Sequence, residues 1–326
     1  MILCSILWQV TISIRGSAAD VNVPRARFSI IHPQAFPGAD PRELLSTVHR
    51  LIGDYPLAVL EITSIPEAAT RHAVRRAMEA SSTGCVFLSG LPIMRAGASL
   101  CAEGEARERA VTLAASLVRE AADLGAEAFV MVSGADPGAA GRGRAIANLL
   151  ESLAQIHEHV ARTGHPMTLR LEPTDREMHW RQLLGPTSDA LGVVSAMAAR
   201  GLVVDLNIDV SHILQLGEDI GGTLGIAASN SRHVHLSNCV IGSGEDPLFG
   251  DHHPPFGHPG SETGPSELVR ILHALHYHGF LSADDPSVIG IEVVPLAGDD
   301  PWATLDQATS DVALAWHSAF AVALQR

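Results

Sequence analysis

A repeated alternation between short apolar runs and longer helical stretches constrains this chain more than any other feature of its 326 residues. This order is typical of parallel β/α units, in which each strand is followed by a helix that covers the sheet. Eight such units match the size of a closed (β/α)8 barrel. We therefore predict a single α/β domain with the TIM-barrel fold. The predicted strands are Phe28–His32, Leu57–Thr63, Val86–Gly90, Ala128–Ser133, Thr168–Glu172, Leu202–Asp209, His233–Leu236 and Ile289–Val293.

The stretches between the strands have helical periodicity, and several of them end at a glycine, such as Gly125 and Gly164. A doubly wound sheet is the alternative architecture. Against it, no GxGxxG motif follows the first strand, so the usual nucleotide-binding turn of that fold is missing. The predicted helices are Pro41–Leu51, Pro66–Ala80, Gly104–Leu124, Ile146–Thr163, Ser188–Ala199, Ser266–His278 and Trp302–Leu324.

Residues 1–26 precede the first predicted unit. Their apolar start has no basic segment and is shorter than the roughly 20 residues that a membrane span needs. We interpret them as a short N-terminal extension, either an extra edge strand or an extended segment, with a weak signal peptide as the alternative. The barrel is then predicted to occupy residues 27–326.

The composition excludes several classes of function. With 22 basic and 36 acidic residues the formal net charge is −14, so the chain repels phosphate backbones and anionic membranes, and we expect neither nucleic acid nor membrane as a partner. All 22 basic residues are arginines, which excludes Schiff-base chemistry and lysine-dependent phosphate loops. The four cysteines form no CxxC pair and are typical of reduced thiols in a cytoplasmic protein.

Polar residues stand where a TIM barrel carries its active site, at the C-terminal ends of the strands. Glu172, Asp209, His235 and Glu292 each lie at or next to the end of an apolar run. Three carboxylates and an imidazole crowded together would repel one another unless a cation were present. The pattern therefore predicts a divalent metal ion, and its many oxygen ligands favour manganese, magnesium or cobalt over a structural zinc.

The order of these residues resembles a known family. A glutamate, then Asp-x-x-His, then His-x-His-Leu and a last-strand Ile-Glu is similar to the xylose isomerase-like TIM-barrel superfamily, which includes ketohexose epimerases, inosose dehydratases and AP endonucleases. The resemblance spans residues 28–326 and is strongest over 169–295. It implies one divalent ion, manganese first and magnesium, cobalt or zinc as alternatives. The ligands that it implies are Glu172, Asp209, His235 and Glu292.

The resemblance also indicates residues for the substrate. It implies that His212 contacts substrate, whereas Glu177 falls one residue short of a second substrate-contacting glutamate. The epimerase arginine that follows the seventh strand is replaced by Ile241. Asp251-x-His253 resembles a zinc-binding motif of AP endonucleases, but the fourth strand lacks the further histidines that those nucleases need.

We interpret the loop around Asp251, His252 and His253 as a lid with substrate-binding or proton-transfer residues, with a purely structural proline-rich loop as the alternative. His32 and Glu61, at the first two strands, are expected to set specificity. His233 shares a strand face with His235 and is interpreted as a supporting residue.

Two further groups of residues have structural interpretations. The histidines at 273, 276 and 278 indicate a solvated helix face, because they lie away from the strand ends. The glycine-rich segment 134–144 indicates a flexible connection rather than a phosphate site.

These residues together predict a sugar isomerase or epimerase that abstracts a proton next to a carbonyl and forms an enediolate. The resemblance implies that Glu172 and Glu292 remove and return the proton. A lyase is the alternative, either like an inosose dehydratase or like a C-glycoside deglycosidase, which would need a second, non-identical subunit. A metal-binding barrel without catalysis is a third hypothesis. The expected partner is a small sugar or keto-sugar, and a homo-oligomer is in keeping with the superfamily.

Overall fold

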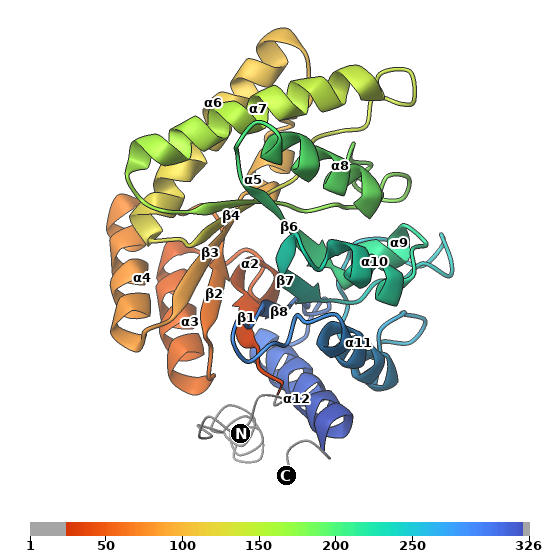
Figure 1. Cartoon of the computed structure of the whole chain (residues 1–326). Coiled ribbons are helices and arrows are strands. Elements are labelled where there is room, and N and C mark those ends of the chain that lie inside the picture. The colour runs from red at the N-terminus through yellow and green to blue at the C-terminus, as the bar shows by residue number, and fades with distance from the viewer. Residues whose placement is uncertain (1–23, 322–326) are drawn as a thin grey trace.

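The computed structural model describes residues 24–321 and shows a closed barrel of parallel strands surrounded by helices (Figure 1). Each strand pairs with its neighbours in sequence, and β8 closes the ring by pairing with β1 through Arg27↔Val288 and the next three partners. The TIM-barrel prediction is confirmed. The strands are β1 (Arg27–Ile31), β2 (Val59–Ile62), β3 (Gly84–Leu88), β4 (Ala128–Met131), β5 (Thr168–Leu171), β6 (Val204–Asp209), β7 (Ser231–Leu236) and β8 (Val288–Ile291).

The longer helices begin and end at the signals expected from the sequence. Asp40 starts α3 with a capping box, in which its side chain accepts hydrogen bonds from the amides of Arg42 and Glu43. Gly125 and Gly164 end α6 and α7 in the left-handed conformation that favours glycine. The longer helices are α3 (Pro41–Asp54), α4 (Ala68–Ser81), α6 (Gly104–Leu124), α7 (Arg142–Thr163), α8 (Thr187–Ala198), α11 (Pro265–Tyr277) and α12 (Pro301–Phe320).

Short helices occur where the sequence analysis predicted none. They have between four and eight residues, too few for a helical period to stand out from the sequence. Two of them, α2 and α9, directly follow the strands β1 and β6 at the C-terminal end of the barrel. They are α2 (His32–Ala35), α5 (Gly90–Arg95), α9 (Val210–Gln215) and α10 (Ile220–Ala227).

The main hydrophobic core lies between the outer face of the barrel and the helices. Its largest fully buried side chain, Trp316 of α12, meets Phe28 of β1 edge to face at 5.3 Å between ring centroids. Inside the barrel, strands β1 to β4 and β8 contribute a second apolar cluster that includes Ile31, Val86 and Val130. The interior side chains of β5 to β7 are instead largely polar, and this asymmetry positions the site.

The described residues also bear on the cysteine and membrane predictions. Cys85, Cys101 and Cys239 are buried free thiols, whereas Cys4 lies outside the described residues. Within 24–321, none of the helices combines the length and the apolar character needed to cross a bilayer. Most of the predicted N-terminal extension, residues 1–23, and the last residues of the predicted closing helix also lie outside the described part.

Candidate metal centre and substrate pocket

Four acidic and imidazole side chains meet at the C-terminal end of the barrel. Glu172 and Glu292 come directly after β5 and β8, Asp209 is the last residue of β6, and His235 lies near the end of β7. Each offers one ligand atom, and these atoms all lie within 4.8 Å of one another. His235 Nδ1 is 2.7 Å from Glu292 Oε2, 3.6 Å from Glu172 Oε1 and 3.7 Å from Asp209 Oδ2. The structure therefore brings the four predicted ligands together.

Asp209 is the most rigidly held of the four. One of its oxygens, Oδ1, caps α9 by accepting from the amide and hydroxyl of Ser211, at 2.6 and 2.5 Å, and from the Ser237 hydroxyl at 2.6 Å. The other oxygen, Oδ2, is buried and has no hydrogen-bond partner among the described residues. A buried carboxylate oxygen without a donor is costly. A cation placed among the four side chains would fill this vacant position, so the donor set fits a divalent metal.

The electrostatics of the cluster show how strongly these groups interact. Burial is the main reason that the pKa of Glu172 rises to about 7, and the carboxylates of Glu292 and Asp209 raise it further. Burial opposes ionisation of Glu292 as well, but His253 and His235 bring its pKa down to about 2. Burial lowers the pKa of His235, yet the carboxylates on its two sides hold it well above its ordinary value. The cluster therefore holds protons that a divalent cation would displace.

A pocket opens above the cluster, lined by residues that follow several of the barrel strands. One wall is apolar and comes from the first, third and fourth β/α units, with Ile31, Met94 and Val132. The other wall is polar. Among the described residues that line the pocket there is no arginine, so nothing takes the place of the epimerase arginine. The polar lining includes Gln34, Glu172, Thr174, Trp180, His212, His235, Asp251, His253 and Glu292.

The loop after β7 is fixed to this polar wall. His253 is buried in the left-handed conformation, with φ +46°, and its carbonyl accepts from the Val294 amide at 2.8 Å. Its Nε2 lies 3.2 Å from Asp251 Oδ1 and 3.5 Å from Glu292 Oε1. A non-glycine residue with positive φ persists only where its surroundings enforce it, and such residues cluster at functional sites.

Asp251 is the centre of this loop's contacts. It accepts hydrogen bonds from the Trp180 indole and from Gln215 Nε2, and its Oδ1 lies 3.5 Å from His212 Nδ1. Burial opposes ionisation, but His253 and His212 hold the pKa of Asp251 well below its usual range. This anchored loop is part of the pocket wall, and its exposed His252 packs at a tilt against the ring of His179 and does not line the pocket.

Three of the residues predicted to bind substrate lie away from the pocket lining. His32 is the first residue of α2, not the last of β1, and its Nε2 is 2.7 Å from Thr47 Oγ1 of α3. Because the preceding Ile31 faces into the barrel, His32 faces outward. Glu177 lies exposed between β5 and α8, where it does not line the pocket. Glu61 is completely buried, next to His235 and outside the pocket. The other three, His212, Asp251 and His253, do line it.

Sequence analysis missed several side chains that hold the cluster. Gln34 Nε2 donates to Glu292 Oε1 at 3.0 Å, and Asn207 Nδ2 donates to Glu172 Oε1 at 2.9 Å. Asn207 was detectable, because it precedes Asp209 by two residues on the same strand and must share its face. Gln34 and Trp180 come from the segments after β1 and β5, whose course no periodic pattern reveals.

The other histidine and arginine groups keep structural roles. His273 and His276 contact the ring of Phe320, and the described residues that could hold a metal do not include them. Arg142 opens α7 and is paired with Asp136 at 2.7 Å, so this arginine is already neutralised.

Comparison with known proteins agrees with this architecture. The family model described as "Xylose isomerase-like TIM barrel" matches residues 47–303. No curated protein matches the chain in sequence.

Solved structures share the fold at low sequence identity. D-psicose 3-epimerase from Clostridium cellulolyticum H10 is 15% identical with a TM-score of 0.62, and covers 91% of this chain and 99% of its own. L-ribulose 3-epimerase is 18% identical with a TM-score of 0.68, over 91% and 97%. The 3-keto-D-glucoside 4-epimerase YcjR from E. coli is 14% identical with a TM-score of 0.62, over 88% and 99%.

Proposed function

The chain belongs to the xylose isomerase-like TIM-barrel family, and from this premise we propose that it is an enzyme that epimerises or isomerises a sugar by moving a proton next to a carbonyl. The observation that carries the proposal is the convergence of Glu172, Asp209, His235 and Glu292 at the base of a pocket. A barrel that served only as a scaffold would have no physical need for three clustered carboxylates at its mouth.

The same four side chains would hold one divalent ion. Asp209 Oδ2 has no hydrogen-bond partner among the described residues, and most of the ligand atoms are oxygens. Both features support manganese first, with magnesium, cobalt or zinc as alternatives. When bound, the ion would supply Lewis-acid polarisation of the substrate carbonyl, which acidifies the neighbouring C–H.

Glu172 and Glu292 are the proposed acid–base pair. They come from β5 and β8, separated around the ring by two strands, so that they approach a bound substrate from different directions. One carboxylate removes the proton and the other returns it, which inverts the carbon if the two faces differ. Asn207 orients Glu172, and Gln34 orients Glu292, through the hydrogen bonds already described.

The walls of the pocket match a sugar. Ring C–H groups would lie against the apolar wall, and hydroxyls would reach His212, Asp251 and His253 on the polar wall. Names of the structural neighbours, two of them 3-epimerases and one a 4-epimerase of a 3-keto-glucoside, support a ketose or keto-sugar. The buried free cysteines are in keeping with a cytoplasmic enzyme.

Elimination is a second candidate, favoured by two specific observations. The pocket lining lacks the arginine of the epimerases, and His253 stands between Asp251 and Glu292, where an imidazolium could protonate a leaving group. In this version the same carbanion loses water or an aglycone from the β carbon. A deglycosidase of this kind would also co-purify with a second, different subunit.

The test uses the full-length protein, stripped of metal and reloaded with Mn²⁺. Ketoses, inososes and keto-glycosides are incubated with it in deuterated water and followed by NMR. Deuterium incorporation with an inverted or isomerised product supports epimerisation, and loss of water or aglycone supports elimination. Glu172→Gln and Glu292→Gln are expected to lower turnover at least about 100-fold, whereas the exposed Glu177→Gln serves as the matched control. Full activity of both site variants would contradict the assignment.

A further inference from the structure

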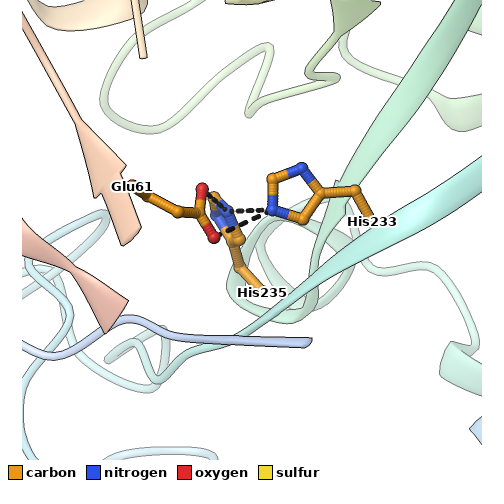
Figure 2. A group of neighbouring side chains, drawn as sticks. All are labelled: Glu61, His233 and His235. Atoms are coloured by element: carbon orange, nitrogen blue, oxygen red, sulfur yellow. Dashed lines mark hydrogen bonds and ion pairs between the residues drawn. The ribbon is translucent and has the colours of Figure 1, made fainter. Parts of the chain in front are cut away.

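A second polar cluster lies one layer deeper in the barrel than the metal centre. Figure 2 shows two imidazoles, His233 and His235 of β7, converging on the carboxylate of Glu61 from β2. His235 Nε2 is 3.0 Å from Glu61 Oε2, and His233 Nε2 is 2.9 Å from Glu61 Oε1. Ser29 Oγ donates to the same Oε1 at 2.5 Å. All four residues have at most 1% of their surface exposed, so water cannot substitute for a missing partner.

Arg170 determines which imidazole nitrogens of this cluster carry protons. Its guanidinium nitrogen lies 3.1 Å from His233 Nδ1. A guanidinium only donates hydrogen bonds, so His233 Nδ1 must be the acceptor and carry no proton. The proton of a neutral His233 is then on Nε2, from which it donates to Glu61 Oε1.

The same hydrogen bonds determine which nitrogen of His235 is protonated. The two Nε2 atoms also lie 3.2 Å apart, but the ionised Glu61 is the nearer acceptor for both, so each imidazole donates to it and His235 carries a proton on Nε2. Its Nδ1, which faces Glu172, Asp209 and Glu292, is then the nitrogen free to bind a cation. Metal-binding histidines commonly have their second nitrogen fixed in this way, and loss of the fixing partner typically costs about 10–100-fold in metal affinity.

We propose that Glu61, with its proton arrangement set by Arg170 through His233, is a positioning residue that fixes His235 with Nδ1 toward the metal centre. The inference rests on the proposed function, because it presupposes a metal at the four ligands. Glu61 then supports the metal centre from beneath and does not have the predicted role in substrate specificity.

The competing interpretation is a second metal ion held by Glu61, His233 and His235, whose ligand atoms also lie within 4.8 Å of one another. An imidazole that binds metal through Nε2 normally keeps its proton on Nδ1. In His233 that proton would point at an N–H of Arg170, so two donors would face each other at 3.1 Å. The arginine therefore favours hydrogen bonds over a second ion.

The first experiment measures metal content and Mn²⁺ affinity of the full chain. The wild type is expected to bind one ion, and Glu61→Gln to bind it about 10–100-fold more weakly. Arg170 keeps His233 as a donor, so the glutamine oxygen must turn toward His233 and its NH2 toward His235. His235 then carries its proton on Nδ1, against the metal. Glu127→Gln, which removes a carboxylate paired with Arg27 away from both imidazoles, is the matched control and should bind normally.

A double-mutant cycle separates orientation from simple loss of charge. Arg170→Met alone should change the affinity little, because Glu61 still accepts from His235. In the Glu61→Gln background it should recover most of the lost affinity, because His233 can then accept from the glutamine NH2. A charge effect would instead tighten binding by the same factor in both backgrounds, and that result would overturn the proposal.

A second measurement needs no variant, and so it remains decisive if Glu61→Gln does not fold. The ¹⁵N spectrum of histidine-labelled, metal-free wild type should show His233 protonated on Nε2 alone. In the zinc-loaded protein, His235 should bind through Nδ1 and retain a proton on Nε2. Two ions per chain, or a proton on His233 Nδ1, would refute the inference. A wild type that binds no metal would refute the proposed function as well, whereas normal binding by Glu61→Gln would refute the inference alone.

Discussion

Replacing Gly290 with alanine tests how tightly the polar layer inside the barrel is packed. Gly290 lies on β8 directly beside His235 in the strand register. A methyl group at this position would lie 2.8 Å from Glu61 Oε1, from His235 Cδ2 and from Ile31 Cδ1. Carbon atoms do not approach other heavy atoms so closely, so all three neighbours would have to move.

The expected cost follows from the surroundings of these neighbours. Glu61, His235 and Ile31 have between 0 and 1% of their surface exposed, so none can turn into solvent to relieve the contact. Overpacking of this kind costs about 1–3 kcal/mol, and we expect the upper half of that range. For a chain of this size the melting temperature should then fall by roughly 3–4 °C. A displaced His235 ring should also weaken Mn²⁺ binding by about 10-fold or more.

The assay is thermal and urea unfolding of the metal-free protein, followed by Mn²⁺ titration. Gly192→Ala is the matched control, because Gly192 is an exposed residue within α8 and an added methyl group meets no atom within 4 Å. Alanine favours the helix there, and the control should gain about 0.5–1 kcal/mol. Wild-type stability and wild-type metal affinity in Gly290→Ala would show that the layer is not packed around His235 as described.

Three further outcomes are expected. Dialysis against a chelator should abolish turnover, and Mn²⁺ should restore it. At a Mn²⁺ concentration of 100 times the dissociation constant, the free energy of unfolding should rise by about 2.7 kcal/mol. An active metal-free protein would contradict this prediction. Asp251→Asn should lower turnover about 10–100-fold at unchanged metal content, because His212 and His253 lose the carboxylate that orients them; unchanged kinetics would refute the role. Burial lowers the pKa of His32 from 6.5 to about 4, so the unfolded chain binds more protons between these values and stability should fall as the pH drops from 6.5 to 4. The loss in the free energy of unfolding due to His32 is about 3 kcal/mol, and it should be absent from urea unfolding of His32→Gln. The same pH dependence of stability in wild type and His32→Gln would contradict this prediction.

The sequence was sufficient to predict the fold and to bring the four candidate ligands to one end of the barrel, because both depend on periodic patterns. Alternating strand and helix periods define the barrel, and the strand ends must meet at one face. Asp209 and His235 could be placed because the first closes a strand and the second stands one residue before a strand end, where residues two apart share a face. Glu172 and Glu292 follow strands in the same way.

The remaining site residues depended on details that no period encodes. His32 was expected at the pocket because both faces of β1 carry apolar residues, so the sequence does not tell which alternating set points into the barrel; the structure turns Ile31 inward. Glu177, Gln34 and Trp180 belong to connecting segments whose course is set by tertiary contacts. Glu61 lies on the predicted second strand, but the sequence does not report how deep in the barrel a residue lies.

The asymmetry of the barrel interior has a functional explanation that stability alone does not provide. A TIM-barrel interior is normally filled by branched apolar side chains, as it is here around Ile31 and Val130. Replacing buried ionic groups by apolar residues of similar volume is often neutral or stabilising, so stability is a weak reason for a barrel interior to contain Glu61, His233 and Arg170. They form instead one chain of hydrogen bonds that ends at His235. A barrel that must hold a metal in one orientation therefore needs a defined proton arrangement in the layer beneath its ligands as well as the ligands themselves.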